Sequence, residues 1–340
     1  MDNVDLQVLR QATTWLAQGH RVVLGTITRT WGSAPRPPGS SVALRDDGLV
    51  AGSVSGGCIE GAVITAAQKT MSDGIPQLLS FGVTQDMAWE VGLACGGRVE
   101  VWVERAEPEQ LQRLLVALSA RQSLVVVTSL STGQRQVLQR PEDAASIPSI
   151  AEPLLTACRD AFSRDGATDL DLPDGQRFFL WSLQPALRLL IVGAVHTAQP
   201  LSQMASQCDF DVTIIDPRTA FATEARFPSV TLCKEWPEPA LAKLGIDRRT
   251  ALLTLTHDPK LDDPALVRAL RSDAFYIGSL GSGKTHAARL GRLRGRGFGD
   301  EDLARIRGPV GLKIGARSPA EIGVSILAQL IETLRREPAE

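Results

Sequence analysis

The sequence predicts a protein of mixed α and β structure, in which an N-terminal α/β domain precedes a C-terminal Rossmann-like domain with a doubly wound parallel sheet. At 340 residues the chain exceeds the usual size of one compact core, so two domains are expected. The second half alternates nearly continuous apolar runs with helical segments, which is typical of parallel strands covered on both faces. Pro185 marks the expected hinge, which places the domains at residues 1–183 and 187–340.

The first half is expected to combine strands and helices with two glycine-rich loops. Helical periodicity predicts helices at 5–19, 108–120 and 150–162. Apolar and β-branched runs predict strands at 21–30, 41–45, 76–82, 98–104, 123–130 and 178–185. Residues 49–71 predict a strand that breaks into a Gly/Ser loop and then becomes a helix. The segment from 139 to 172 is the least regular part of this half.

The second half predicts a repeated strand–helix order. Strands are expected at 187–194, 211–216, 230–233, 250–258 and 274–279, with one more short strand at 309–314. Helices are expected between them, at 197–208, 237–245 and 264–272. Ser318 and Glu321 have the spacing of a capping box at the start of a long final helix, with Pro319 at its first position.

The composition excludes several classes of protein. A formal net charge of −2 and a pI near 6.2 argue against binding to nucleic acid or a membrane surface. The first residues lack the features of a signal peptide, and no apolar run reaches the ~20 residues that span a bilayer. Five cysteines at irregular spacing suit free thiols in a reducing compartment. We therefore expect a soluble cytoplasmic protein.

A phosphate-binding pattern occurs late in the chain. Gly278, Gly283, Lys284 and Thr285 complete G-x-x-x-x-G-K-[ST] between a strand and a helix. A nucleoside triphosphatase would need a later strand that ends in an acidic residue to hold Mg²⁺, and none is present. Two interpretations remain. The segment is either a βα turn whose glycines only permit tight geometry, or a turn that also contacts a phosphate without hydrolysis, because N–H groups at a helix start attract anions. The candidate residues of this turn are Gly278, Gly281, Ser282 and Lys284.

A second turn resembles a dinucleotide-binding fingerprint with a defect. Gly193 occupies the first glycine position of G-x-G-x-x-G, but Val195 occupies the second, where the backbone should approach a pyrophosphate. Asp216 ends the next strand, about where a ribose-binding carboxylate belongs. His196 is a candidate for phosphate contact or proton transfer, although a lone histidine at a helix start more often caps or packs. An NAD- or NADP-dependent oxidoreductase is therefore the alternative function.

Five segments in the same order along the chain resemble the XdhC/CoxI family. They are "GSVSGGCIEGAV", "GLACGGRVEVWVE", "LLIVGAVHTAQPL", "YIGSLGSGKTHAARL" and "GPVGLKIGARSPAEIGVSILAQLI". Members of this family are accessory factors of molybdenum hydroxylases such as xanthine dehydrogenase. One glycine motif alone would carry little weight, but five in order are specific.

The resemblance implies a chaperone rather than a turnover enzyme. Such a protein holds the molybdenum cofactor, as molybdopterin or its cytidine dinucleotide form, while a cysteine desulfurase supplies the terminal sulfido ligand. It then delivers the cofactor to an apo molybdenum hydroxylase. Further implied partners are a molybdopterin nucleotidyltransferase and a second copy of the chain, and the Rossmann-like domain is a candidate for binding a nucleotide.

The candidate cofactor-binding residues lie in two glycine-rich loops. The first loop offers Ser53, Ser55 and the N–H groups of Gly56 and Gly57, which we expect to be unobstructed at a helix start. Glu60 lies in the first turn of that helix. The remaining candidates are Cys58 in the first loop and Cys95, Gly96 and Gly97 in the second.

Cys58 and Cys95 are candidate contacts to molybdenum or sulfur, because thiolates are soft ligands. Cys58 lies at a helix start, which favours the thiolate, and Cys95 lies in a glycine-flanked loop that enters a strand. The two loops are expected to face the crevice of the Rossmann-like lobe and to hold one anionic pterin–metal guest between them. Cys158, Cys208 and Cys233 are expected to be small buried hydrophobic residues. Arg36 and Trp31 are weaker candidates for anion contact and for stacking on a pterin. No sequence pattern of an independent zinc site occurs.

Overall fold

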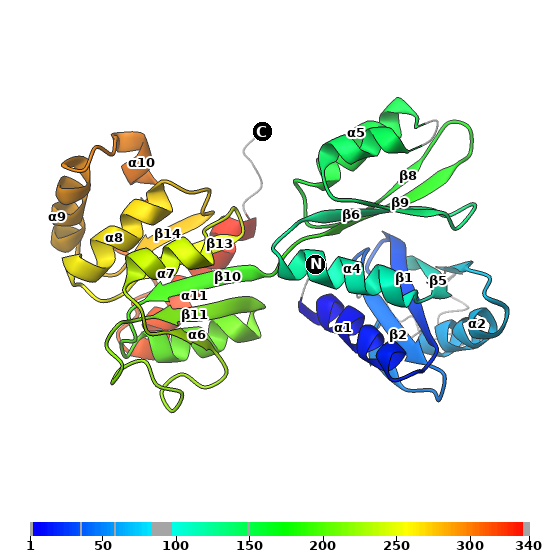
Figure 1. Ribbon diagram of the computed structural model, residues 1–340, viewed down its shortest axis with the longest axis horizontal. Helices are drawn as coiled ribbons and strands as arrows, with labels where there is room; N and C mark the ends of the chain where they lie inside the picture. The colour runs from blue at the N-terminus through cyan, green and yellow to red at the C-terminus, as the bar shows by residue number, and fades with distance from the viewer. Residues whose placement is uncertain (1–2, 35, 58, 83–96, 148–149, 336–340) are drawn as a thin grey trace. The chain divides into compact units, whose positions relative to one another are not determined.

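The computed structural model describes residues 3–34, 36–57, 59–82, 97–147 and 150–335. The chain forms two compact units, residues 1–185 and 186–340. The first unit holds two antiparallel sheets and the second a parallel sheet covered by helices on both faces (Figure 1). This confirms the predicted fold class, with the Rossmann-like sheet in the second unit. No described helix is both long enough and apolar enough to span a bilayer.

The larger sheet of the first unit has five strands in the order β3-β2-β1-β5-β4. Their bounds are β1 Val22–Trp31, β2 Ser41–Arg45, β3 Val50–Gly52, β4 Gln77–Gly82 and β5 Arg98–Arg105. Side chains alternate between faces, so Val101 packs against helix α2 (Glu60–Asp73) while Trp102 packs against helices α1 (Asn3–Ala17) and α4 (Pro108–Ser119). Both faces of this sheet are therefore buried.

The smaller sheet has the order β7-β6-β9-β8. Its strands are β6 Leu124–Ser129, β7 Arg135–Leu138, β8 Gly166–Asp171 and β9 Arg177–Leu183. One face shares the core of α1 and α4, and the other is covered by α5 (Glu152–Ala161) and the 3₁₀ helix η1 (Pro141–Ser146). Ion pairs connect the two sheets, from Arg177 to Glu100 at 2.6 Å and from Arg29 to Asp171 at 2.8 Å.

The second unit has six parallel strands in the order β12-β11-β10-β13-β14-β15. Numbered within the unit, this is the order 3-2-1-4-5-6 of a Rossmann fold. The strands are β10 Leu187–Val192, β11 Phe210–Ile215, β12 Thr231–Cys233, β13 Thr250–Thr254, β14 Tyr276–Ser279 and β15 Ile306–Arg307. The strand expected at 309–314 is wrong, since β15 precedes it and Gly311 turns the chain with φ 100°.

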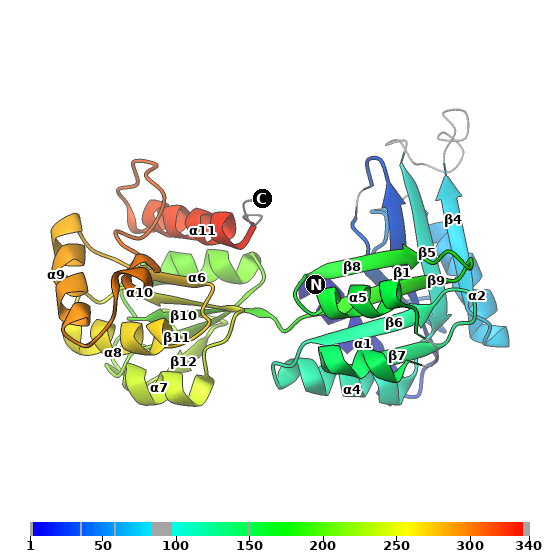
Figure 2. The ribbon, with the colours of Figure 1, turned by 90° about the horizontal axis from the view of Figure 1, so that it is seen from above.

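Helices cover both faces of this parallel sheet (Figure 2). Leu189 and Ile191 face α6 (Ala198–Gln207) and α11 (Pro319–Arg335), while Leu190 and Val192 face α7 (Pro237–Leu244) and α8 (Pro259–Leu270). Helices α9 (Gly283–Arg294) and α10 (Asp300–Ala304) complete the second layer.

The capping box of the final helix is confirmed by two reciprocal hydrogen bonds. The N–H of Glu321 donates to Ser318 Oγ at 3.2 Å, and the N–H of Ser318 donates to Glu321 Oε2 at 3.0 Å.

Candidate functional site

The strands that lead into the two glycine-rich loops of the first unit run toward the same end of the five-stranded sheet. Strands β1 and β3 run in the same direction because each is antiparallel to β2, so the chain after Trp31 and the loop after Gly52 leave their strands in the same direction. Gly52 itself is level with Gly25, six residues before Trp31. Gly82 pairs with Arg98, and Arg98 pairs with Trp31, so the segment between β4 and β5 begins and ends level with Trp31. We call the end of the sheet toward which β1, β3 and β4 run, marked by Trp31, Gly82 and Arg98, the loop edge; it is uppermost in the first unit in Figure 2.

The loop that follows β3 is folded around its own carboxylate. Glu60 accepts hydrogen bonds from Ser53 Oγ at 2.7 Å, from the N–H of Ser55 at 2.9 Å and from the N–H of Gly57 at 2.9 Å. The hydroxyl of Ser55 also donates to Glu60, and the N–H of Gly56 donates to Ser53 Oγ at 2.8 Å. The expectation that the Gly56 and Gly57 N–H groups are unobstructed is therefore wrong, because both are paired inside the loop.

The charge of Glu60 is strongly stabilised. Burial acts to raise the pKa of this carboxyl, but the hydrogen bonds from Ser53, Ser55 and the loop backbone outweigh it and hold the pKa at about 2. Gly56 and Gly57 have φ of 74° and 118°, a region that glycine adopts without strain. A Cβ built on either glycine would have no atom within 4 Å, so the outer side of the loop is open. The loop is thus rigid inside and accessible outside.

The second loop returns to the sheet close to the Pro/Gly loop that follows β1. A Cβ on Gly97 would lie 2.7 Å from the carbonyl oxygen of Ser33 and 3.0 Å from that of Trp31, so only glycine fits. Cys58, Cys95 and Gly96, the other candidates of these loops, lie outside the described residues. Of their described neighbours, Gly97 precedes Arg98 at the loop edge, and Gly57 and Ile59 belong to the loop that follows Gly52.

Trp31 is in cation–π contact with two guanidinium groups at the loop edge. The guanidinium carbon of Arg98 is 4.9 Å from the ring centroid, and that of Arg29 is 5.5 Å away. Arg29 is paired with Asp169 and Asp171, whereas exposed Arg98 forms no ion pair with any residue in the described ranges. Arg36, by contrast, pairs with Asp5 at 3.3 Å. The sequence interpretation missed Arg98, although its position directly after a glycine-rich loop was a usable signal.

The other three cysteines differ in their surroundings. Cys158 is buried under the smaller sheet, and burial raises the pKa of its thiol to about 11. Cys233 is partly buried, but Cys208 is exposed, because it ends helix α6 instead of lying inside it. The expectation of burial is therefore wrong for Cys208. Among the described residues, no group of three or more His, Cys, Asp or Glu side chains is placed to hold a metal ion.

In the second unit, side chains from two neighbouring turns close the turn after β10. Gly193 has φ 114°, and a Cβ there would lie 2.6 Å from Thr256 Cγ2, so the turn after β13 presses directly on it. The N–H of Ala194 donates to Asp216 Oδ2 at 2.8 Å. His196, which follows this turn, is exposed. A backbone donor that could face a pyrophosphate is therefore already used.

Asp216 has no capacity left for a ribose. Its side chain is fully buried, and Arg218 donates to it through Nε at 2.9 Å, through Nη2 at 2.7 Å and through the backbone N–H at 2.9 Å. With the bond from Ala194, four donors occupy the roughly four acceptor sites of the carboxylate. Burial acts to raise its pKa, but the bonds from Arg218 and Ala194 outweigh it and lower the pKa. The residues of this turn therefore do not fit a dinucleotide.

Arg218, which the sequence interpretation missed, lies only two residues beyond Asp216. A basic residue at that spacing after a strand-end carboxylate was the available signal.

The G-x-x-x-x-G-K-[ST] segment does not form a phosphate-wrapping loop. Gly278 lies inside β14, where a Cβ would be 2.6 Å from Leu253 Cδ2, so close packing explains this glycine. Only Leu280, Gly281 and Ser282 join β14 to α9. Ser282 Oγ caps the helix by accepting the N–H of Thr285 at 3.2 Å, and Lys284 is exposed. The turn is thus a short βα connection with a capped helix.

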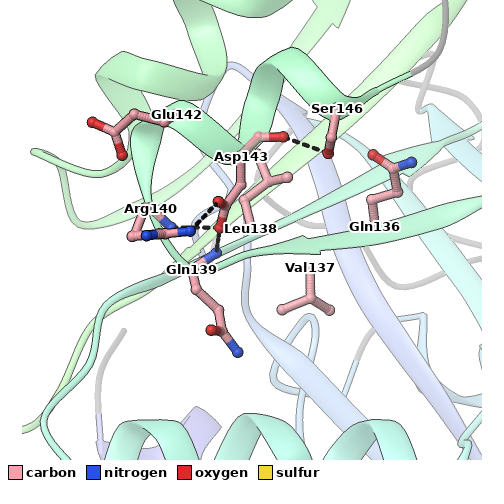
Figure 3. A pocket seen from close by; sticks show the side chains of 8 residues that line it. All are labelled: Gln136, Val137, Leu138, Gln139, Arg140, Glu142, Asp143 and Ser146. Carbon is pink, nitrogen blue, oxygen red and sulfur yellow. Dashed lines mark hydrogen bonds and ion pairs between the residues drawn. The ribbon is translucent and has the colours of Figure 1, made fainter.

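A pocket of about 520 Å³ lies elsewhere in the first unit, between strand β7 and η1 (Figure 3). The Asp143 carboxylate closes one side by accepting the N–H groups of Gln139 at 2.9 Å and Arg140 at 3.0 Å. None of the residues predicted from sequence lines this pocket, and its lining offers no thiol. It therefore has no part in the candidate site.

Comparisons with known proteins agree on one family. A family model described as the XdhC Rossmann domain matches residues 189–330, and one described as the XdhC and CoxI family matches residues 15–82. The molybdenum cofactor insertion chaperone PaoD of Escherichia coli is 29% identical over 95% of this chain and 86% of its own length. A Bacillus subtilis protein named as a probable xanthine dehydrogenase subunit is 28% identical over 94% of this chain and 96% of its own.

A solved structure has the same fold over nearly the whole chain. The crystal structure of a xanthine dehydrogenase from Bacillus halodurans superposes with a TM-score of 0.74 and 26% identity. The match covers 98% of this chain and 96% of that one.

Proposed function

The chain belongs to the XdhC and CoxI family, and from this we propose that it is a molybdenum-cofactor chaperone that serves a molybdenum hydroxylase of the xanthine dehydrogenase type. The similarity to a molybdenum cofactor insertion chaperone over most of both chains supports the proposal. In this proposal the first unit handles the cofactor, and the guest is cargo rather than a permanent cofactor.

The observation that carries the proposal is that β3 and β4, which lead into the two glycine-rich loops, both run toward the loop edge. The guest is an anionic pterin phosphate whose dithiolene holds molybdenum. We assign Cys58 and Cys95 as its sulfur contacts and Gly96 as a position that allows close approach, while Gly97 lets the second loop pack on the backbone of Ser33. Ser53, Ser55, Gly56, Gly57 and Glu60 hold the first loop in shape through the bonds around Glu60. Their role is therefore to position Cys58.

Positive charge for the anionic guest comes from side chains, because the loop N–H groups are already used. Arg98 is exposed at the loop edge and lies within cation–π distance of Trp31, as does Arg29. A guanidinium group fits a phosphate in a bidentate manner. The proposal extends to holding the cofactor while a cysteine desulfurase supplies sulfur, and to delivery to the apo-hydroxylase.

The alternative, an NAD- or NADP-dependent oxidoreductase, receives no support from the geometry. Asp216 is saturated by Arg218 and Ala194, and Val195 occupies the second glycine position of the fingerprint.

Anaerobic loading of the purified chain with molybdenum cofactor, followed by gel filtration and analysis of pterin and molybdenum, tests the proposal. We expect near-stoichiometric retention by the wild type and about tenfold weaker retention by Cys58→Ser and Cys95→Ser. Cys208→Ser is the matched control, because Cys208 is an exposed thiol in the other unit, and it should retain cofactor like the wild type.

Two failures of this experiment have different meanings. If the wild type retains no pterin, the proposed function is wrong. If all three variants retain cofactor like the wild type, the assignment of the two sulfur contacts is wrong while binding itself stands.

A further inference from the structure

A buried arginine lies beneath the turn that starts helix α9. Arg289 is 2% exposed, and its Nη2 donates to the carbonyl oxygen of Leu280 at 2.9 Å. Its Nε and Nη1 find no acceptor in any part of the chain that the structure describes. The nearest carboxylate, Asp262, lies 3.9 Å from Nη2 and already accepts the hydroxyl of Thr256 at 2.6 Å. Asp262 supplies a nearby negative charge, but two buried donors without an acceptor are costly.

The charges on α9 are arranged against the usual rule. Helix starts favour acidic residues, but the first turn of α9 has none and instead carries exposed Lys284. Lys284 forms no ion pair with any residue in the described ranges. Arg292 and Arg294, further along the helix, are paired with Asp263 and Asp300. Among the lysines and arginines of this helix, Lys284 alone has no ion pair within the described residues. Arg289, whose ion pair with Asp262 is long at 3.9 Å, reaches the turn before the helix through its bond to Leu280.

The start of α9 is also open and correctly placed for a ligand. A Cβ on Gly283 would have no atom within 4 Å, and Gly281 has φ 142°. The N–H groups of Gly283 and Lys284 are at the first positions of the helix, where intrahelical acceptors are missing. The turn follows the carboxyl end of β14, on the side of a doubly wound sheet where ligands bind.

We propose that the start of helix α9, with Gly283, Lys284 and the buried Arg289, is a binding site for a phosphate or diphosphate group. The N–H groups of Gly283 and Lys284 donate to the phosphate oxygens, and the Lys284 ammonium pairs with them from the solvent side. Arg289 does not contact the phosphate. It fixes the turn Leu280–Ser282 through its hydrogen bond to Leu280 and makes the electrostatic potential at the turn more positive. The site binds and does not hydrolyse, since the wrapping loop and acidic strand end of a triphosphatase are not formed by the described residues.

Calorimetric titration of the full chain with inorganic pyrophosphate, and separately with cytidine diphosphate, tests this site. We expect saturable binding by the wild type and about tenfold weaker binding by Lys284→Met and Arg289→Met. Arg294→Met is the matched control, because it removes the same charge from the far end of the same helix and should bind within about twofold of the wild type. If cytidine diphosphate binds more tightly than pyrophosphate, the site is assigned to nucleotides. If the two probes bind equally, the site is assigned to diphosphate groups in general. Either result supports the proposed site.

A fourth variant separates loss of binding from loss of folding. Gly283→Asp should raise the melting temperature without ligand, because it places a negative charge at a helix start, and should abolish pyrophosphate binding through repulsion. The inference is overturned if the wild type gives no saturable binding at millimolar probe, or if Gly283→Asp and Lys284→Met bind like the wild type. It does not depend on the proposed function, because neither probe carries pterin or molybdenum.

Discussion

Single carboxylates decide how two glycine-rich turns of this chain behave. Glu60 collects donors from the loop after β3, and Asp216 collects donors from Arg218 and from the turn after β10. In both turns the chain's own negative charge uses N–H groups that a ligand anion would otherwise accept. Anion binding at either turn must therefore rely on side chains or on rearrangement.

The first prediction concerns Glu60→Gln. The pKa of Glu60 is held at about 2 against an ordinary 4.5, so its ionised form stabilises the fold above pH 4.5. The contribution is lost as the pH falls from about 4.5 to about 2. We expect Glu60→Gln to lower the free energy of unfolding at pH 7 by about 1–2 kcal/mol, a value reduced for solvent screening. The difference from the wild type should shrink through the same pH window.

Urea unfolding at several pH values, followed by tryptophan fluorescence, measures this effect. Five of the six tryptophans lie in residues 1–185, so the signal reports mainly the first unit. Glu109→Gln is the control, because Glu109 is 89% exposed and its substitution should change little at any pH. A wild-type advantage over Glu60→Gln that is unchanged at pH 3 would refute the account of the loop.

The second prediction concerns nicotinamide cofactors. Because the Asp216 oxygens already accept four hydrogen bonds, a ribose hydroxyl would have to displace Arg218 or Ala194. A thermal-shift titration should therefore show no change in melting temperature with NAD or NADP at millimolar concentration. A saturable upward shift with either compound would restore the oxidoreductase alternative.

At the scale of elements, Thr256 joins three βα turns of the Rossmann-like sheet. Its methyl group packs on Gly193, its hydroxyl donates to Asp262, and Asp262 faces Arg289 beneath the turn before α9. The turns after β10, β13 and β14 are therefore packed as one assembly. A substitution in one of these turns should therefore change the stability of the other two.

The third prediction follows from this contact. Gly193→Ala places a Cβ 2.6 Å from Thr256 Cγ2 at φ 114°, and should destabilise the second unit by about 2–3 kcal/mol. Adding Thr256→Ser removes the methyl group and keeps the hydroxyl, so the double variant should recover the steric part of the loss. Urea unfolding followed by circular dichroism measures both. Strict additivity of the two substitutions would contradict the contact.

The sequence predicted elements best where burial follows a simple period. β10, β11 and β13 were evident because both faces of a parallel strand are apolar. Strand β8 was missed because its sequence, GATDLD, has no buried residue and is a strand only through pairing with β9. The apolar run at 309–314 is not a strand because Gly311 turns under α11, where a Cβ would lie 2.3 Å from Ser325 Oγ.

The candidate site was only partly predictable. The serines, glycines and carboxylate of the first loop do come together, but the sequence could not show that Glu60 would take the loop's own donors. The contacts of Arg98 with Trp31 and of Arg289 with Leu280 form only when the chain folds, and no local sequence pattern predicts them. The residues that gather in the first loop were thus predictable from the sequence, while their hydrogen-bond partners were not.

At the scale of the whole molecule, the two proposals give each unit a separate ligand. The first unit presents a polar, cationic loop edge for a pterin–metal guest, and the second unit presents a phosphate site at the start of α9. The predicted facing of the two loops toward the Rossmann-like crevice stays a prediction. Hydrogen–deuterium exchange can assign the guest to one surface without any substitution.

The most direct test of the central claim compares amide exchange in the full chain before and after anaerobic loading with molybdenum cofactor. We predict slower exchange in peptides that cover residues 53–60 and 95–98, in the two glycine-rich loops. Peptides that cover the pocket between β7 and η1, residues 136–146, should not change. Protection confined to residues 136–146, or no protection anywhere in the first unit despite bound cofactor, would contradict the claim that the loop edge holds the guest.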